Sequence, residues 1–221
     1  MTLLIGTISD KHAVITADGL SRVNLITGAG VGSDTFQKIF PVTNHPIAFV
    51  HHGLNILGGK PIDEFIEGYT SAHAAAFVAS SIKDIAEHLR SYAEQDAQNA
   101  LAHPTNKGVV GFWIAGFGTR KGKPELYEIC WPEKPAPFKH EPIVFGGDAK
   151  EFIELYLSQP LGPFRPEDIA KSSVSFIRQY HQALYKQAES KQAKTQQAIF
   201  GGRLHQLVLM KAGWEWTRPP K

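Results

Sequence analysis

The chain has 221 residues, of which 43% are hydrophobic and 20% charged, and its formal net charge is +2. This length and composition fit one globular domain, residues 1–221, that can form its own core, and the small net charge argues against a nucleic-acid partner. The single cysteine, Cys130, excludes an internal disulfide and any metal site made of cysteines alone.

The first third of the sequence is typical of β-strands. Residues 2–8 and 12–17 are apolar or β-branched on either side of a short polar turn, which predicts a hairpin with a buried face. A glycine-rich stretch at residues 28–32 predicts a loop. Two further short strands are expected over residues 36–42 and 47–51.

The middle of the chain changes to a helical pattern. Pro and two acidic residues at 61–64 are typical of a helix start. Residues 74–100 contain neither Pro nor Gly and carry apolar residues at helical spacing, which predicts one long helix or two in succession. Strands are expected to return at 109–117 and 125–131.

The last third combines both patterns. A short strand is expected at residues 143–145, a helix over 148–157 behind an Asp N-cap, and another helix over 166–191. A final strand pair is expected at 206–210 and 214–216. Strands and helices therefore occur in groups, which favours an α+β fold over a parallel sheet.

The chain carries neither the pattern of a secretory signal nor an apolar run near the roughly 20 residues of a membrane-spanning helix. We therefore expect a cytoplasmic protein that does not contact a membrane.

Four residues stand in a distinctive order on the predicted strands. Thr2 opens the first strand, Asp18 ends the second, Lys38 lies on the third and Gly53 ends the fourth. In this order the chain resembles the proteasome β-subunit family of N-terminal nucleophile (Ntn) hydrolases, as a divergent bacterial homologue. The resemblance implies a four-layer αββα sandwich of two antiparallel sheets between helix layers. It also implies a homo-oligomeric ring or stacked rings, without a cofactor or a metal ion.

The resemblance further implies a threonine-type peptidase or amidohydrolase. A threonine hydroxyl needs a base, and an N-terminal threonine has one in its own α-amine, so Met1 must be removed to expose Thr2. Lys38 would assist the proton transfer, and Asp18 would hold and tune the lysine. The N–H of Gly53 would donate to the oxyanion. The substrate would be a peptide or amide, cleaved through an acyl-enzyme.

Taken alone, each of these residues has an ordinary explanation. A threonine at position two is common, Asp18-Gly19 is typical of a turn, and a lone lysine is usually solvated. The neighbouring residues His51 and His52 should point to opposite faces of a strand, which argues against a shared metal ion.

Supporting groups of the resembled family are replaced in this chain. Gly147 stands where that family has a serine, and Gln197 and Phe200 stand where it has an aspartate and a serine. Two alternatives to a hydrolase therefore remain. One is a non-catalytic structural subunit of a proteasome-like ring, and the other is a module that binds a small molecule in the same cleft.

Overall fold

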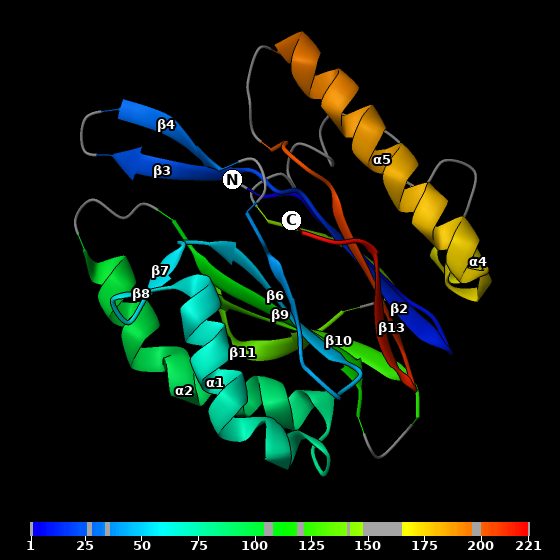
Figure 1. The fold of residues 1–221 in the computed structure, drawn as a ribbon, viewed down its shortest axis with the longest axis horizontal. Coiled ribbons are helices and arrows are strands. Elements are labelled where there is room, and N and C mark those ends of the chain that lie inside the picture. Colours follow the sequence, from blue (N-terminus) through cyan, green and yellow to red (C-terminus); the bar gives the residue numbers. More distant parts are fainter. Residues whose placement is uncertain are drawn as a thin grey trace.

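A computed structural model describes residues 2–25, 28–33, 36–103, 108–118, 122–140, 142–147, 165–195 and 200–220. The described chain is a mixed α+β structure whose paired strands are antiparallel (Figure 1). The α+β class expected from the grouping of strands and helices is therefore confirmed. The helix expected over 148–157 lies outside the described residues.

The described strands form two five-stranded sheets. The first sheet has the order β12-β1-β2-β13-β14, with bounds Ile143–Gly146, Leu4–Ile8, His12–Ala17, His205–Met210 and Gly213–Arg218. The second has the order β11-β10-β9-β6-β5, with bounds Lys134–Lys139, Pro124–Trp131, Val110–Phe117, Ile47–Gly53 and Ile39–Pro41. Two short ribbons accompany the sheets, β3 (Ser21–Leu25) with β4 (Gly28–Ser33) and β7 (Ile56–Leu57) with β8 (Lys60–Pro61).

Strand β6 shows how both faces of a sheet become buried. Ile47 and Phe49 pack with the helices α1 (Ile62–Phe77) and α2 (Ile82–Ala102). The alternate residues Ala48 and Val50 pack in a cluster that also takes side chains from the first sheet. Because neighbouring side chains on a strand point to opposite faces, one apolar strand serves two core layers.

The helices lie on different sheets (Figure 1). The helices α1 and α2 cover the second sheet, whereas α4 (Pro166–Lys171) and α5 (Val174–Thr195) pack on the first. Helix α2 starts at a capping box, in which Ser81 and Asp84 bond each other's backbone N–H groups. The capping box starts a new helix within residues 74–100, which contain neither Pro nor Gly. It explains why this stretch belongs to two successive helices instead of one.

Two of the expectations are wrong in detail, and the sequence did not predict every strand. The glycine-rich stretch is not a loop, since Gly28–Ser33 is strand β4 and pairs with β3. Strand β11, which contains two prolines, was not expected. The single helix expected over 166–191 is two helices, α4 and α5, and Ser173 bonds the N–H of Phe176 at the start of the second.

A buried histidine joins α5 to the first sheet. The ring nitrogens Nε2 and Nδ1 of His181 lie 2.7 Å from Thr7 Oγ1 and 2.9 Å from Thr16 Oγ1. Gln206 Nε2 in turn donates to Thr16 Oγ1 at 3.0 Å. Burial lowers the pKa of His181 from 6.5 to about 3, so the folded protein holds this ring neutral.

We expect the stability of the protein to fall on acidification between pH 6.5 and 3. In that window the unfolded chain protonates His181 and the folded chain does not, so this group lowers the free energy of unfolding by about 1.4 kcal/mol per pH unit. Denaturant unfolding at pH 7, 6, 5 and 4 measures the slope. His181→Gln should have the shallower slope, and a slope equal to that of the parent chain would contradict the assignment.

None of the helices that the structure describes is both long and apolar enough to cross a membrane.

Candidate functional site

The candidate site lies where β2 and β6 end and where β1 and β5 begin. Asp18 directly follows β2, and its side chain turns back to the start of β1. Its Oδ1 accepts the N–H of Leu3 at 2.8 Å, while its own N–H donates to the Leu3 carbonyl at 3.2 Å. These two bonds fix the carboxylate beside the peptide that joins Thr2 to Leu3.

Lys38 approaches the same carboxylate from the other sheet. It immediately precedes β5, and its carbonyl accepts the N–H of His51 on β6 at 2.9 Å. Its Nζ lies 2.7 Å from Asp18 Oδ1, and the two side chains are 3% and 0% exposed. One oxygen atom therefore joins the Lys38 ammonium to the Thr2–Leu3 peptide.

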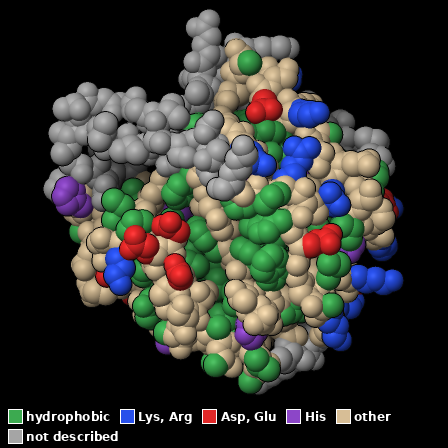
Figure 2. All heavy atoms as spheres, in the orientation of Figure 1, with side chains coloured by type: hydrophobic (Ala, Val, Ile, Leu, Met, Phe, Trp, Pro, Cys, Tyr) green, Lys and Arg blue, Asp and Glu red, His purple; other side chains and the backbone are tan. Residues whose placement is uncertain are grey.

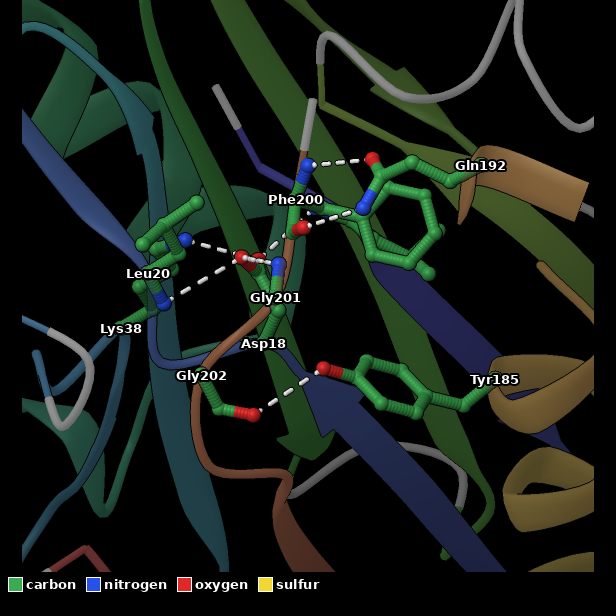
Figure 3. Close-up of polar contacts among 9 residues, drawn as sticks. Asp18, Leu20, Lys38, Tyr185, Gln192, Phe200, Gly201 and Gly202 are labelled. Atoms are coloured by element: carbon green, nitrogen blue, oxygen red, sulfur yellow. Dashed lines mark hydrogen bonds and ion pairs between the residues drawn. The ribbon is translucent and has the colours of Figure 1, made fainter. Parts of the chain in front are cut away.

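The second oxygen of Asp18 is also fully engaged (Figure 3). Its Oδ2 accepts the N–H groups of Leu20 at 3.3 Å and Gly201 at 3.2 Å. Four donors from four segments of chain therefore surround one buried carboxylate. Such a carboxylate can hold an ammonium in place, but it has no open position from which to take a substrate proton.

Thr2 is 4% exposed and lies against Gly147. At this glycine φ is +77°, and a Cβ would overlap the Thr2 carbonyl oxygen and lie 3.0 Å from the Thr2 Cβ. A serine at position 147 would therefore be strained and would collide with Thr2. The backbone at position 147 therefore favours the glycine that the sequence has.

Gly53 ends β6, the strand that pairs with β5 just after Lys38. Its φ is +96°, and a Cβ at this position would overlap the carbonyl oxygen of Val109. Only glycine fits this backbone. Thr2, Asp18 and Lys38 are joined by the contacts described above, and Gly53 lies on the strand that neighbours Lys38.

Side chains of helix α5 hold the segment around Gly201 in place (Figure 3). The sequence did not predict these contacts. Gln192 donates its Nε2 to the Phe200 carbonyl at 2.8 Å and accepts the Phe200 N–H at 2.9 Å. The Tyr185 hydroxyl donates to the Gly202 carbonyl at 3.2 Å. Phe200, which was noted only as a replacement for serine, is 1% exposed and packs in the core. Gln197 lies outside the described residues.

His205 is a second group that sequence spacing did not identify. It is fully buried at the start of β13, and neither ring nitrogen has a hydrogen-bond partner among the described residues. Burial, followed by the charges of Lys38 and Arg203, lowers its pKa to about 4. The ring is therefore a neutral polar group, and it lies close enough to Lys38 for that charge to lower its pKa.

The two neighbouring histidines point to opposite faces of β6, as expected. His51 packs on Phe112 on the helix-covered side, and its Nδ1 lies 3.1 Å from the Gly111 carbonyl. His52 faces Glu128 instead, at 3.5 Å between Nε2 and Oε1. In the described ranges, no three His, Cys, Asp or Glu side chains gather in a way that could hold a metal ion.

The sequence matches no model of a known protein family, and no curated protein is similar enough to count as a relative. Function is therefore inferred from the residues and their geometry. The arrangement places a buried ammonium, held by a saturated carboxylate, next to the first peptide of the chain. Such a group can stabilise negative charge and assist proton transfer at a hydroxyl close by.

Proposed function

We propose that the chain is a threonine-type Ntn hydrolase that cleaves a peptide or amide bond through an acyl-enzyme on Thr2. The observation that carries the proposal is the shared oxygen of Asp18, which accepts both Leu3 N–H and Lys38 Nζ. It brings the lysine to the residue whose hydroxyl and α-amine the chemistry needs. The resemblance of the four residues to the proteasome β-subunit pattern supports the same assignment.

The reaction begins once Met1 has been removed. The free α-amine of Thr2 takes the proton of Oγ1, and Oγ1 attacks the carbonyl carbon of the substrate. The N–H of Gly53 stabilises the resulting oxyanion. The amine then passes the proton to the leaving nitrogen as the C–N bond breaks, which leaves an ester on Thr2. Water hydrolyses this ester by the same sequence of proton transfers.

Lys38 and Asp18 make the proton transfer easier. A buried ammonium next to the Thr2–Leu3 peptide favours the form in which negative charge grows on Oγ1. Asp18 keeps that ammonium in position, because its oxygens accept hydrogen bonds from backbone N–H groups on three other segments. The pair therefore acts as a fixed electrostatic element rather than as the base.

The packing supports the four-layer αββα arrangement of this family. One apolar cluster lies between the two sheets, with residues such as Leu4 and Leu207 from the first and Val50 and Trp113 from the second. Separate clusters lie between each sheet and its helices. A stack of helices, sheet, sheet and helices accounts for these clusters.

The proposal includes assembly into a homo-oligomer, as a ring or stacked rings. Hydrophobic side chains reach the surface near the centre of the face in Figure 2, and charged groups of both signs lie around them. An apolar area edged by charges is typical of a protein–protein contact. Size-exclusion chromatography with light scattering tests this part directly.

A non-catalytic ring subunit is the second candidate, favoured by the burial of Thr2. At 4% exposure, its hydroxyl is reached by a substrate only after the covering residues move or are removed. A subunit that keeps Met1 would have the buried pair and no base. The two candidates therefore differ in the state of the N-terminus.

N-terminal sequencing and intact mass of the purified protein decide between them. We expect Thr2 as the first residue and, after incubation with a trileucine vinyl sulfone, one adduct located on Thr2 by peptide mapping. Complete retention of Met1, or an adduct on another residue, would refute the hydrolase. The chain would then be assigned to the structural candidate.

A further inference from the structure

Glu128 on β10 is a buried carboxylate outside the proposed catalytic group. It is 8% exposed, and its Oε1 accepts the Trp113 Nε1–H at 3.2 Å. Its Oε2 lies 3.1 Å from His140 Nε2 and 3.3 Å from Lys134 Nζ. Burial by itself raises the pKa of Glu128, but the contacts with His140 and His52 outweigh it and hold the pKa well below its ordinary value. The contacts with His140 and His52 therefore favour the charged form of this buried carboxylate.

His52 reaches this anion across a neighbouring strand. It lies on β6, Glu128 lies on β10, and β9 runs between them. The imidazole crosses β9 at Gly111, where a Cβ would overlap the ring. Its Nε2 is 3.5 Å from Glu128 Oε1, and neither ring nitrogen has a well-aligned hydrogen bond within the described chain. The packing of the His52 ring on Gly111 and its attraction to the carboxylate of Glu128 therefore determine its position.

The position of His52 matters because the next peptide carries the N–H of Gly53. On the other side of this glycine, the Leu54 N–H donates to the Val109 carbonyl at 2.9 Å. A glycine backbone is soft, and an oxyanion donor works only when its direction is fixed beforehand. His52 fixes the peptide on one side, and the Leu54 bond fixes it on the other.

The same anion also supports the opposite side of the site. Trp113, which donates to Glu128, lies directly against Gly146 at the end of β12, where a Cβ would overlap its ring. The next residue, Gly147, is the one that packs on Thr2. Glu128 is therefore connected through one ring to the proposed oxyanion donor and through another ring to the glycine behind the nucleophile.

From these contacts we propose that Glu128 and His52 are positioning residues, which hold the Gly53 N–H in the direction that an oxyanion requires. This inference rests on the hydrolase function proposed above. Neither residue touches the substrate. Their loss should weaken the stabilisation of a tetrahedral oxygen and leave the nucleophilicity of Thr2 intact.

Two electrophiles with the same trileucine sequence separate these effects. With the aldehyde, Oγ1 of Thr2 bonds to the carbonyl carbon, and the hydroxyl proton passes through the α-amine to the new hemiacetal oxygen at the oxyanion position. With the vinyl sulfone, Oγ1 adds to the alkene carbon β to the sulfone, which is attached to the last leucine, and the proton goes to the carbon beside the sulfone. The second reaction forms no tetrahedral oxyanion on the attacked carbon, because its negative charge develops beside the sulfone.

We expect His52→Leu to raise the inhibition constant of the aldehyde about 10-fold, because a misdirected donor loses part of the 10²–10³-fold effect of an oxyanion contact. Labelling by the vinyl sulfone should stay within about 2-fold of the parent rate, since it uses no oxyanion donor. Glu128→Gln should behave like His52→Leu. His52→Gln, which keeps a polar N–H group facing Glu128, should recover most of the aldehyde affinity. Glu125→Gln is the matched control, because it removes a carboxylate on β10 that pairs with Lys139 instead.

An aldehyde affinity equal to that of the parent in both His52→Leu and Glu128→Gln would overturn the inference. Equal losses with both electrophiles would also overturn it, since they would show a general structural role. Failure of the unmodified protein to react with either electrophile at Thr2 would instead refute the hydrolase function itself. Thermal unfolding of each variant verifies that the comparison is made on folded protein.

Discussion

Thr2→Ala should reduce hydrolysis of a fluorogenic peptide by at least about 10³-fold, as expected when a nucleophile is removed. The substitution deletes Oγ1 and keeps the α-amine, the Cβ that touches Gly147 and the Leu3 N–H bond to Asp18. The fold and any assembly should therefore be unchanged. Initial rates, intact mass after treatment with vinyl sulfone, and light scattering measure the three quantities on the same preparation.

Two variants make this result specific. Thr2→Ser keeps a hydroxyl on the same atom and should retain measurable turnover. Thr70→Ala removes a hydroxyl that bonds to helix carbonyls in α1, away from the site, and should react like the parent chain. Turnover in Thr2→Ala equal to that of the parent would show that the nucleophile is elsewhere in the molecule.

Asp18→Asn should lower the free energy of unfolding by about 3–5 kcal/mol, the range for a buried ion pair that loses one partner. The change leaves the Lys38 ammonium buried without its anion, and the amide cannot accept all four of the present donors. Lys38→Met should cost less, because Asp18 keeps three backbone N–H groups. Denaturant unfolding measures both losses.

The double variant separates stability from catalysis. Asp18→Asn combined with Lys38→Met has no unpaired buried charge, so it should be more stable than Asp18→Asn alone and remain inactive. Asp10→Asn is the matched control, because Asp10 pairs with Lys123 at a similar distance of 2.8 Å on the exposed surface. It should change stability far less. Additive losses in the double variant would mean that the buried pair is not coupled.

Much of the fold could be predicted where the local pattern and the tertiary environment agree. The hairpin of β1 and β2 is apolar on both sides of a polar turn, and the structure has both strands. Strand β4 shows the opposite case, because its three glycines predict a loop while pairing with β3 satisfies the backbone regardless of side chains. Strand β11 was hidden by its prolines, which an edge strand tolerates.

The candidate site could be predicted only in part. The order of Thr2, Asp18 and Lys38 along the first strands suggested a cluster, and in the structure one carboxylate oxygen of Asp18 accepts both Lys38 Nζ and the N–H of Leu3, the residue after Thr2. The donor Gly201 is 183 residues away from Asp18, and no local pattern connects the two. The α5 side chains that bond the segment around Gly201 have no distinguishing pattern in the sequence. Groups of this kind are recognised only after the chain has folded.

The hydrogen bond from Gly201 to Asp18 has a consequence for the newly made protein. Gly201 lies just before β13, and β13 fills the place between β2 and β14 in the first sheet. Because synthesis runs from the N-terminus, a ribosome releases Gly201 and β13 long after Thr2, Asp18 and Lys38 have emerged. A nascent or truncated chain therefore lacks one donor to the carboxylate and a strand beside it. On the proposed function, the catalytic group is therefore complete only after β13 has been synthesised, so shorter nascent chains should not cleave neighbouring polypeptides.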